Sequence, residues 1–319
     1  MEKWPELPWA AWRETKDTLH MYTQIVGKIR LAKTAKMNQW WNAGLQVSAR
    51  GLTTGLIPHG ETGFELALDL VDHQLRMRTC DGEAREIPLG LPVNVFYREV
   101  IEGLAAMGLD AAIWPVPVEV MRPVPFTEDT RRTYDPAWAN RIWRVMVLVE
   151  AVFTRHRAGF TGKSSPVQFF WGSFDLAVTR FSGRPALPRP EMEGFMCDAY
   201  NAELISLGFW PGGEWITGET YDRAMFYSYT YPKPDGLERA VVRPEAARWH
   251  PGLGEFVLWY DEVASAADPA AVLLAFAEST YEAGAHLAGW PVQAFALQPE
   301  PAPRVTMFPE AFGEVEAEG

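Results

Sequence analysis

The chain has 319 residues, of which 48% are hydrophobic and 22% charged, and its formal net charge is −12. A chain of this length forms one large domain or two closely packed halves, with a core that needs no disulfide or metal for stability. The acidic surface disfavours nucleic acid as a partner because it repels the phosphate backbone.

The sequence contains two cysteines, Cys80 and Cys197, and neither belongs to a cluster of metal-ligating residues. This favours a reducing compartment over a disulfide framework. No stretch approaches the roughly 18 uncharged apolar residues of a membrane-spanning helix, and the N-terminus lacks an apolar export signal. We therefore expect a soluble, cytoplasmic protein that contacts no membrane.

We predict that residues 1–125 form a first α+β half, built from a helix, antiparallel strands and a second helix. Apolar residues at three- and four-residue spacings indicate a helix over roughly residues 10–34. Period-two alternation follows over residues 45–49 and 64–78 and predicts an antiparallel meander. Pro92 then opens the second helix of this half.

A polar stripe accompanies the apolar stripe of the first helix. His20, Gln24 and Lys28 lie four residues apart and therefore share one face. This face is either solvated or a row of hydrogen-bond donors that points into a cleft.

We predict that residues 126–298 form a second α+β half that packs closely on the first. Residues 299–319 are expected to be a disordered acidic tail. A proline-rich connector, residues 115–135, joins the halves. Asp135-Pro136 and Asp268-Pro269 each combine an N-cap residue with proline at the first helical position, so each predicts a helix start.

The segment from Phe169 to Arg184 predicts the central strand of the second half. Leu176 and Val178 alternate with polar or small residues, the pattern of a half-buried strand. Asp175 and Arg180 lie five residues apart, so they face opposite sides of the strand and do not pair.

The two halves share a spacing that an internal duplication would explain. Trp41 precedes Arg50 by nine residues, and Trp171 precedes Arg180 by the same number. Convergent patterning of two α+β layers is the alternative. The predicted fold class is thus α+β, with antiparallel sheets, helices packed on one face and two similar helix–strands–helix halves.

Five segments resemble the hallmark stretches of an uncharacterised bacterial family, known as domain of unknown function 5996. They lie at residues 18–28, 50–54, 169–184, 208–212 and 278–283. The resemblance covers about residues 4 to 292. It implies a soluble bacterial protein and brings no activity, cofactor or catalytic residue.

Two further patterns permit a functional and a structural interpretation. Glu278, Glu282 and His286 lie on one helix face and have the spacing of metal ligands, but no second cluster supports a metal site, and we predict neither metal nor cofactor. Tyr227 and Tyr229 share a strand face with Tyr231. Such a ladder stacks on a ring-shaped ligand or covers the edge of a core.

The function is not encoded in any of these motifs. Our leading hypothesis is that a small polar or anionic molecule binds in a cleft between the halves, with His20 as a candidate acid–base group. The alternative is a non-catalytic scaffold or regulatory protein that docks a partner through a Trp-rich surface. The candidate ligand-binding residues are Gln24, Lys28, Arg50, Trp171 and Arg180.

Overall fold

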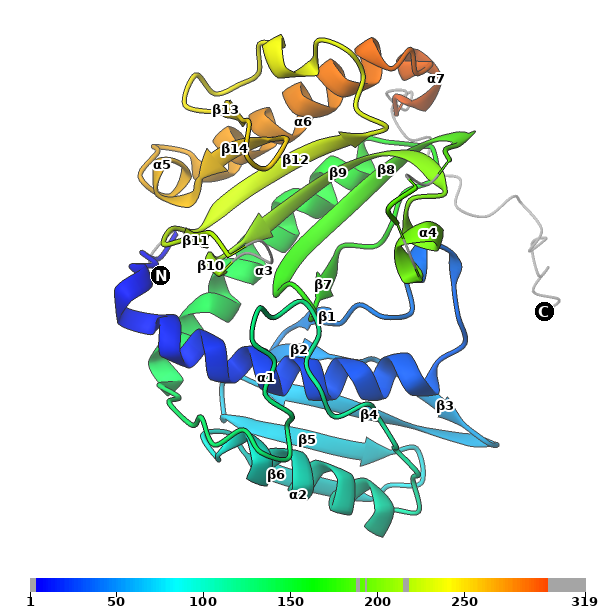
Figure 1. Ribbon diagram of the computed structural model, residues 1–319, viewed down its shortest axis with the longest axis vertical. Coiled ribbons are helices and arrows are strands. Elements are labelled where there is room, and N and C mark those ends of the chain that lie inside the picture. The colour runs from blue at the N-terminus through cyan, green and yellow to red at the C-terminus, as the bar shows by residue number, and fades with distance from the viewer. Residues whose placement is uncertain (1–3, 188–189, 193, 215–217, 298–319) are drawn as a thin grey trace, which may run out of the picture.

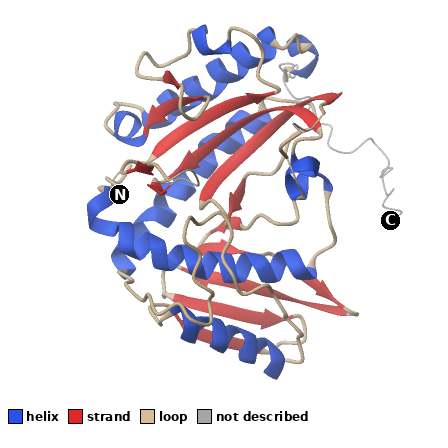
Figure 2. Cartoon of the chain, in the orientation of Figure 1, coloured by secondary structure: helices blue, strands red, loops and turns tan. Residues whose placement is uncertain are grey.

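The computed structural model describes residues 4–187, 190–192, 194–214 and 218–297. Its helices and antiparallel strands confirm the α+β class (Figure 2). The predicted acidic tail, residues 299–319, lies outside the described residues. Within the described part, no helix is long and apolar enough to cross a membrane.

The first half contains a six-stranded antiparallel sheet, which we call the first sheet. Its strands follow the order β1-β2-β4-β5-β6, with β3 beside β4. In Figure 1 this sheet occupies the lower half of the view, and α1 and α2 lie in front of it. The elements are α1 (Trp9–Lys33), η1 (Asn38–Trp40), β1 (Gln46–Ser48), β2 (Gly51–Thr53), β3 (Ile57–His59), β4 (Thr62–Asp69), β5 (Gln74–Thr79), β6 (Ala84–Pro88) and α2 (Val93–Ala106).

The register of the first sheet separates an apolar face from a polar one. Leu68 lies opposite Leu52 and Leu75, and Leu75 lies opposite Ile87. These side chains are almost fully buried. The neighbouring row pairs Ala67 with an arginine and belongs to the other face, because side chains alternate along each strand.

The second half contains another six-stranded antiparallel sheet, the second sheet, with the order β13-β14-β12-β9-β8-β7. It occupies the upper half of Figure 1. The elements are α3 (Pro136–Ala158), β7 (Gln168–Phe170), β8 (Asp175–Pro185), α4 (Phe195–Ala199), β9 (Ala202–Trp210), β10 (Gly213–Glu214), β11 (Thr220–Tyr221), β12 (Met225–Tyr231), η2 (Leu237–Arg239), β13 (Arg248–His250), β14 (Glu255–Trp259), α5 (Tyr260–Ala264), α6 (Pro269–Leu287) and α7 (Val292–Phe295).

Both predicted helix starts are confirmed. The Asp135 carboxylate accepts a hydrogen bond from the Ala137 amide at 2.8 Å, at the start of α3. The Asp268 carboxylate accepts one from the Ala271 amide at 3.0 Å, at the start of α6. Each acid satisfies an amide that has no partner within its helix.

Strand β8 divides its side chains between two environments, as its alternation predicts. Leu176, Val178 and Arg180 face α3 and α6, whereas Asp175 and Ala177 face the opposite side. The predicted strand from Phe169 to Arg184 is divided by a turn, so its first residues belong to β7 and β8 starts at Asp175. Phe174 has a φ of 62°, so it belongs to the turn between β7 and β8.

The two sheets are joined edge to edge. Leu45 and Phe169 exchange two backbone hydrogen bonds, of 2.9 and 2.8 Å, which place β1 beside β7. One hydrophobic core includes side chains from both halves, among them Leu19, Phe96 and Phe209. The boundary between halves at residues 125 and 126 stays a prediction, since no break in the core marks it.

The Trp–Arg spacing that suggested a duplication does not mark equivalent positions. Trp41 precedes β1, whereas Trp171 follows β7. Arg50 lies in the turn between β1 and β2, whereas Arg180 lies within β8. The equal spacing is therefore no structural support for a repeat, although both halves do follow the order helix, strands, helix.

Gly27 provides a test of the contact between α1 and the second half. A Cβ atom at position 27 would lie 2.1 Å from Cδ1 of Trp171. We expect Gly27→Ala to lower the free energy of unfolding by about 1–3 kcal/mol in urea denaturation, because the Trp171 ring must move.

Gly103→Ala in α2 is the matched control. Its Cβ would meet the flexible ends of two side chains, Met77 at 3.2 Å and Arg85 at 3.5 Å. This change should leave stability unchanged or raise it by up to about 1 kcal/mol. Equal effects of the two substitutions would contradict this description of the packing.

Candidate functional site

The polar stripe of α1 is buried and binds main-chain groups from distant parts of the chain. His20 Nε2 lies 3.0 Å from the carbonyl oxygen of Trp171 and 2.9 Å from that of Gly172. The Gln24 amide donates to the Val118 carbonyl at 2.7 Å and accepts from the Val118 amide at 3.0 Å. These bonds fix the turn between β7 and β8 and the proline-rich connector against α1.

His20 stays neutral at physiological pH. Burial, together with the charge of Lys16, lowers its pKa to about 3. Because carbonyl oxygens only accept hydrogen bonds, its Nε2 carries the proton and donates it to Trp171 and Gly172. These contacts give His20 a positioning role.

Two of the remaining candidate residues, Lys28 and Trp171, lie in the same part of the structure as His20 and Gln24. Lys28 Nζ lies 5.7 Å from the centroid of the Trp171 ring, and burial lowers the Lys28 pKa. The indole of Trp171 donates to the Ala43 carbonyl at 2.8 Å. The stripe and Trp171 thus form one cluster.

Arg50 and Arg180 lie elsewhere. Arg50 is half exposed on the first sheet and pairs with Asp69 and Asp72, at 2.6 Å in each case. Arg180 is buried between β8 and α6, where it pairs with Glu278 at 3.2 Å. The expectation that these two cations share a cleft with Gln24 and Lys28 is not met, because each is held by carboxylates of its own half.

The Glu278 side chain is the centre of a buried network between α3, β8 and α6. It accepts from His156 Nδ1 at 2.8 Å and from both terminal nitrogens of Arg180 at 3.2 Å. These partners outweigh its burial and lower the pKa of Glu278 to about 2. Burial lowers the pKa of His156, so the imidazole donates as a neutral group and Arg180 balances the carboxylate charge.

The residues of α6 that have the spacing of metal ligands make separate contacts. Glu282 pairs with Arg243 at 3.4 Å, and His286 Nδ1 lies 2.7 Å from the Glu282 carbonyl. Glu278 faces the buried network instead. Among the described residues, no three His, Cys, Asp or Glu side chains are grouped as metal ligands.

Glu278→Gln preserves the shape of this network but removes the charge opposite Arg180. We expect it to lower the free energy of unfolding by about 1–3 kcal/mol, less than for a fully buried pair because the Glu278 side chain is 34% exposed. Glu282→Gln, one turn later on the same helix, should change stability by less than about 0.5 kcal/mol. Urea denaturation of both variants checks this, and a larger loss for Glu282→Gln would contradict it.

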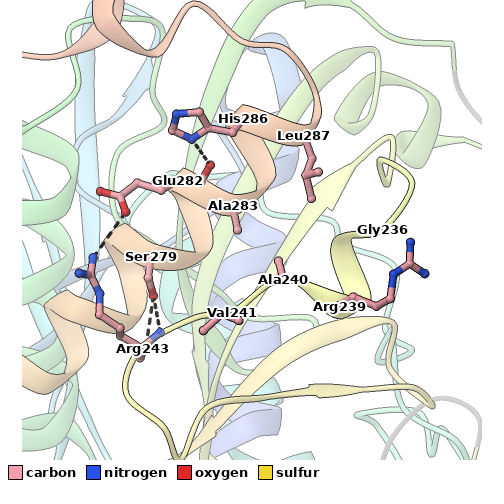
Figure 3. A pocket seen from close by; sticks show the side chains of 10 residues that line it. All are labelled: Gly236, Arg239, Ala240, Val241, Arg243, Ser279, Glu282, Ala283, His286 and Leu287. Carbon is pink, nitrogen blue, oxygen red and sulfur yellow. Dashed lines mark hydrogen bonds and ion pairs between the residues drawn. The ribbon is translucent and has the colours of Figure 1, made fainter.

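A shallow cavity of about 560 Å3 lies beside α6, and Glu282 and His286 are among the residues that line it (Figure 3). The Arg243 amide donates to Ser279 Oγ at 2.8 Å, and the Arg243 guanidinium pairs with Glu282. Val241 at its edge is 94% exposed. The polar groups here are paired with one another, and the walls are open to solvent.

A deeper cavity of about 620 Å3 lies on the second sheet, on the face opposite α3 and α6. We call it the tyrosine–carboxylate cavity. Residues from both halves of the chain line it, including residues of the short helix α4. Its apolar wall includes Trp41, Phe170, Phe181, Phe195 and Met225.

Tyrosines form one side of this cavity. The rings of Tyr227 and Tyr229 are stacked at 6.3 Å with an angle of 13° between their planes. The Tyr229 hydroxyl lies 3.0 Å from that of Tyr200. Gly208 makes room for this arrangement, since a Cβ there would lie 2.0 Å from Cζ of Tyr227. Tyr231 does not line the cavity, and its hydroxyl donates to the Leu187 carbonyl.

Carboxyl groups line the cavity beside these tyrosines. Asp175 accepts hydrogen bonds from the Ser173 and Tyr227 hydroxyls. Glu119 and Glu255 also line the cavity, and neither side-chain carboxyl group has a hydrogen bond or ion pair within the described part of the chain. Loss of solvent and the nearby Asp175 charge raise the pKa of Glu119 to about 7 and that of Glu255 to about 8.

The match to known proteins extends over this whole arrangement. A family model described as "Family of unknown function (DUF5996)" matches residues 4–297. The chain belongs to this family. No curated protein and no solved structure matches the chain.

The family resemblance and the sequence patterns did not identify Glu119 and Glu255. Glu119 lies in the proline-rich connector with a φ of 56°, and Glu255 opens β14. Neither belongs to a motif. The alternation of Tyr227 and Tyr229 was the available signal, and it indicated a strand face that a ring-shaped ligand could contact.

Glu255→Gln tests the desolvation of the cavity through the pH dependence of stability. A carboxyl group whose pKa rises on folding keeps its proton where the unfolded chain has lost it, so the free energy of unfolding falls as pH rises from about 4.5 to 8. We expect the substitution to raise stability by roughly 1–2 kcal/mol at pH 9, a value reduced for the water that enters the cavity.

At pH 4, Glu255 is protonated in both states, and the same substitution should have little effect. Thermal denaturation at both pH values provides the measurement. Equal effects at pH 4 and pH 9 would show that this carboxyl group is solvated.

Proposed function

We propose that this protein binds a small molecule in the tyrosine–carboxylate cavity. The supporting observation is the combination of an apolar, aromatic wall with two carboxyl groups, Glu119 and Glu255, that have no partner in the described chain. The volume of about 620 Å3 lies within the range of ligand sites. Polar groups left without partners in such a wall fix the orientation of a ligand.

The positions of the polar stripe support this proposal indirectly. Gln24 binds Val118, whose neighbour is Glu119, and His20 binds the carbonyl group that precedes Ser173. His20 and Gln24 therefore support the wall of the cavity from behind. If the protein is an enzyme, acid–base chemistry falls to Glu119 and Glu255, whose pKa values lie near neutrality, rather than to His20.

The docking alternative has less support. Of the tryptophans in the described ranges, Trp114 is the one that is largely exposed, at 72%. The others are buried or half buried and serve the core, so no Trp-rich surface is formed there. Cys80 and Cys197 are free thiols, which agrees with the proposed cytoplasmic location.

Ala199→Trp tests the proposal by filling the cavity from α4. The matched control is Ala105→Trp, at an exposed position of α2. A panel of soluble aromatic amines, alcohols and carboxylic acids is screened by thermal shift, and affinities are measured by calorimetry. We expect Ala199→Trp to weaken every bound compound by tenfold or more, about 1.4 kcal/mol, and Ala105→Trp to leave affinity unchanged.

Compounds that bind equally well to both variants would place the ligand outside this cavity. A panel in which nothing binds the native protein would also contradict the proposal.

A further inference from the structure

We infer that the ligand of the tyrosine–carboxylate cavity is an organic cation, an amine or ammonium compound whose charged group meets Glu119 and Glu255 and whose apolar part lies on the tyrosines. This inference rests on the proposed function and specifies the class of ligand. It differs from the sequence-based expectation of a polar or anionic molecule.

The charge of the lining is the first argument. Four acidic side chains line the cavity, Glu119, Asp175, Glu214 and Glu255, and none of its described lining residues is Lys, Arg or His. Two lysines lie close to the lining: Lys16 pairs with Asp17 at 3.5 Å, and Lys163 donates to Gln39 at 2.7 Å beside the Trp41 and Phe181 rings. The acidic side chains outnumber these cations, and low-dielectric walls focus their potential into the space between them, so a cation is attracted and an anion repelled.

The state of the carboxyl groups is the second argument. Asp175 is satisfied, because both of its oxygens accept hydrogen bonds from hydroxyl groups. Glu119 is exposed and Glu255 half-buried, and neither carboxyl group has a donor in the described chain, so both are open to a ligand. An ammonium group supplies both the donors and the opposite charge.

The aromatic wall is the third argument. The stacked rings of Tyr227 and Tyr229 lie on the sheet side of the cavity, and Trp210 lines it as well. The faces of aromatic rings carry negative potential and attract ammonium groups, and the attraction grows when water is excluded. Rings and carboxylates together favour a cation with an apolar body. A neutral sugar is the competing ligand, since it also stacks on rings and donates to carboxylates.

The same geometry predicts that binding strengthens as pH rises. Asp175 faces both glutamates, and Tyr221, Tyr227 and Tyr229 face Glu255. The pKa values of Tyr227 and Tyr229 are raised well above 10, so these tyrosines remain neutral. Glu119 and Glu255 therefore gain negative charge between pH 6 and pH 9.

The first experiment compares four probes by calorimetry at pH 8: phenethylamine, 2-phenylethanol, 3-phenylpropanoate and methyl β-glucoside. We expect phenethylamine to bind at least tenfold more tightly than the other three. Glu255→Gln should reduce its affinity by about tenfold, as expected for the loss of one charge at close range in a partly desolvated site. Glu61→Gln, in the exposed turn before β4, is the matched control and should have no effect.

Titration with benzyltrimethylammonium isolates the contribution of the protein, because the charge of this probe does not change with pH. Its affinity should rise about tenfold between pH 6 and pH 9, since at least one carboxyl group ionises there. A constant affinity would overturn the inference.

The outcomes separate this inference from the proposed function. Suppose that the alcohol, the carboxylate or the glucoside binds as tightly as the amine and that Ala199→Trp weakens its binding. The inferred class of ligand is then wrong, but the proposed cavity is the binding site. If no probe binds, both are overturned. If the amine binds but Ala199→Trp does not lower its affinity, the amine binds outside the cavity, and both the inference and the proposed function are overturned.

Discussion

The hydrogen bonds from α1 to the main chain of distant segments are the constraint on which the functional face of this protein depends. His20 holds the turn between β7 and β8, and Gln24 holds Val118 in the connector. Both side chains are buried, so leaving their polar atoms unpaired would be costly. The chain is therefore fixed where Glu119 and Ser173 enter the cavity.

The second sheet shows how one strand can serve two purposes. On one side of β8, Leu176 and Val178 pack in the core, and Arg180 forms an ion pair with Glu278 of α6. On the other side, Asp175 and Ala177 face a cavity. Because the helices already stabilise one face, the other can carry carboxyl groups whose desolvation costs free energy.

Much of the fold could be predicted from local patterns, because helix caps and strand alternation act over a few residues. Asp135-Pro136 and the alternation in β8 are examples. The site could not, since it depends on contacts between distant segments. The stripe with Lys28 is compatible with solvent or with a cleft, and the main-chain groups that His20 and Gln24 actually bind have no sequence signature. Glu119 and Glu255 are functional candidates because they lack partners, a property that only the folded chain reveals.

The most direct test of this account is the ionisation of Glu255 in the folded protein. The carbonyl carbon of the side chain can be followed by NMR in protein labelled with 13C at glutamate Cδ, with Glu255→Gln to assign the signal. The account predicts a midpoint near pH 8 in the absence of ligand. A midpoint near the ordinary value of 4.5 would show a solvated carboxylate and would contradict a cavity that is poised for a cation.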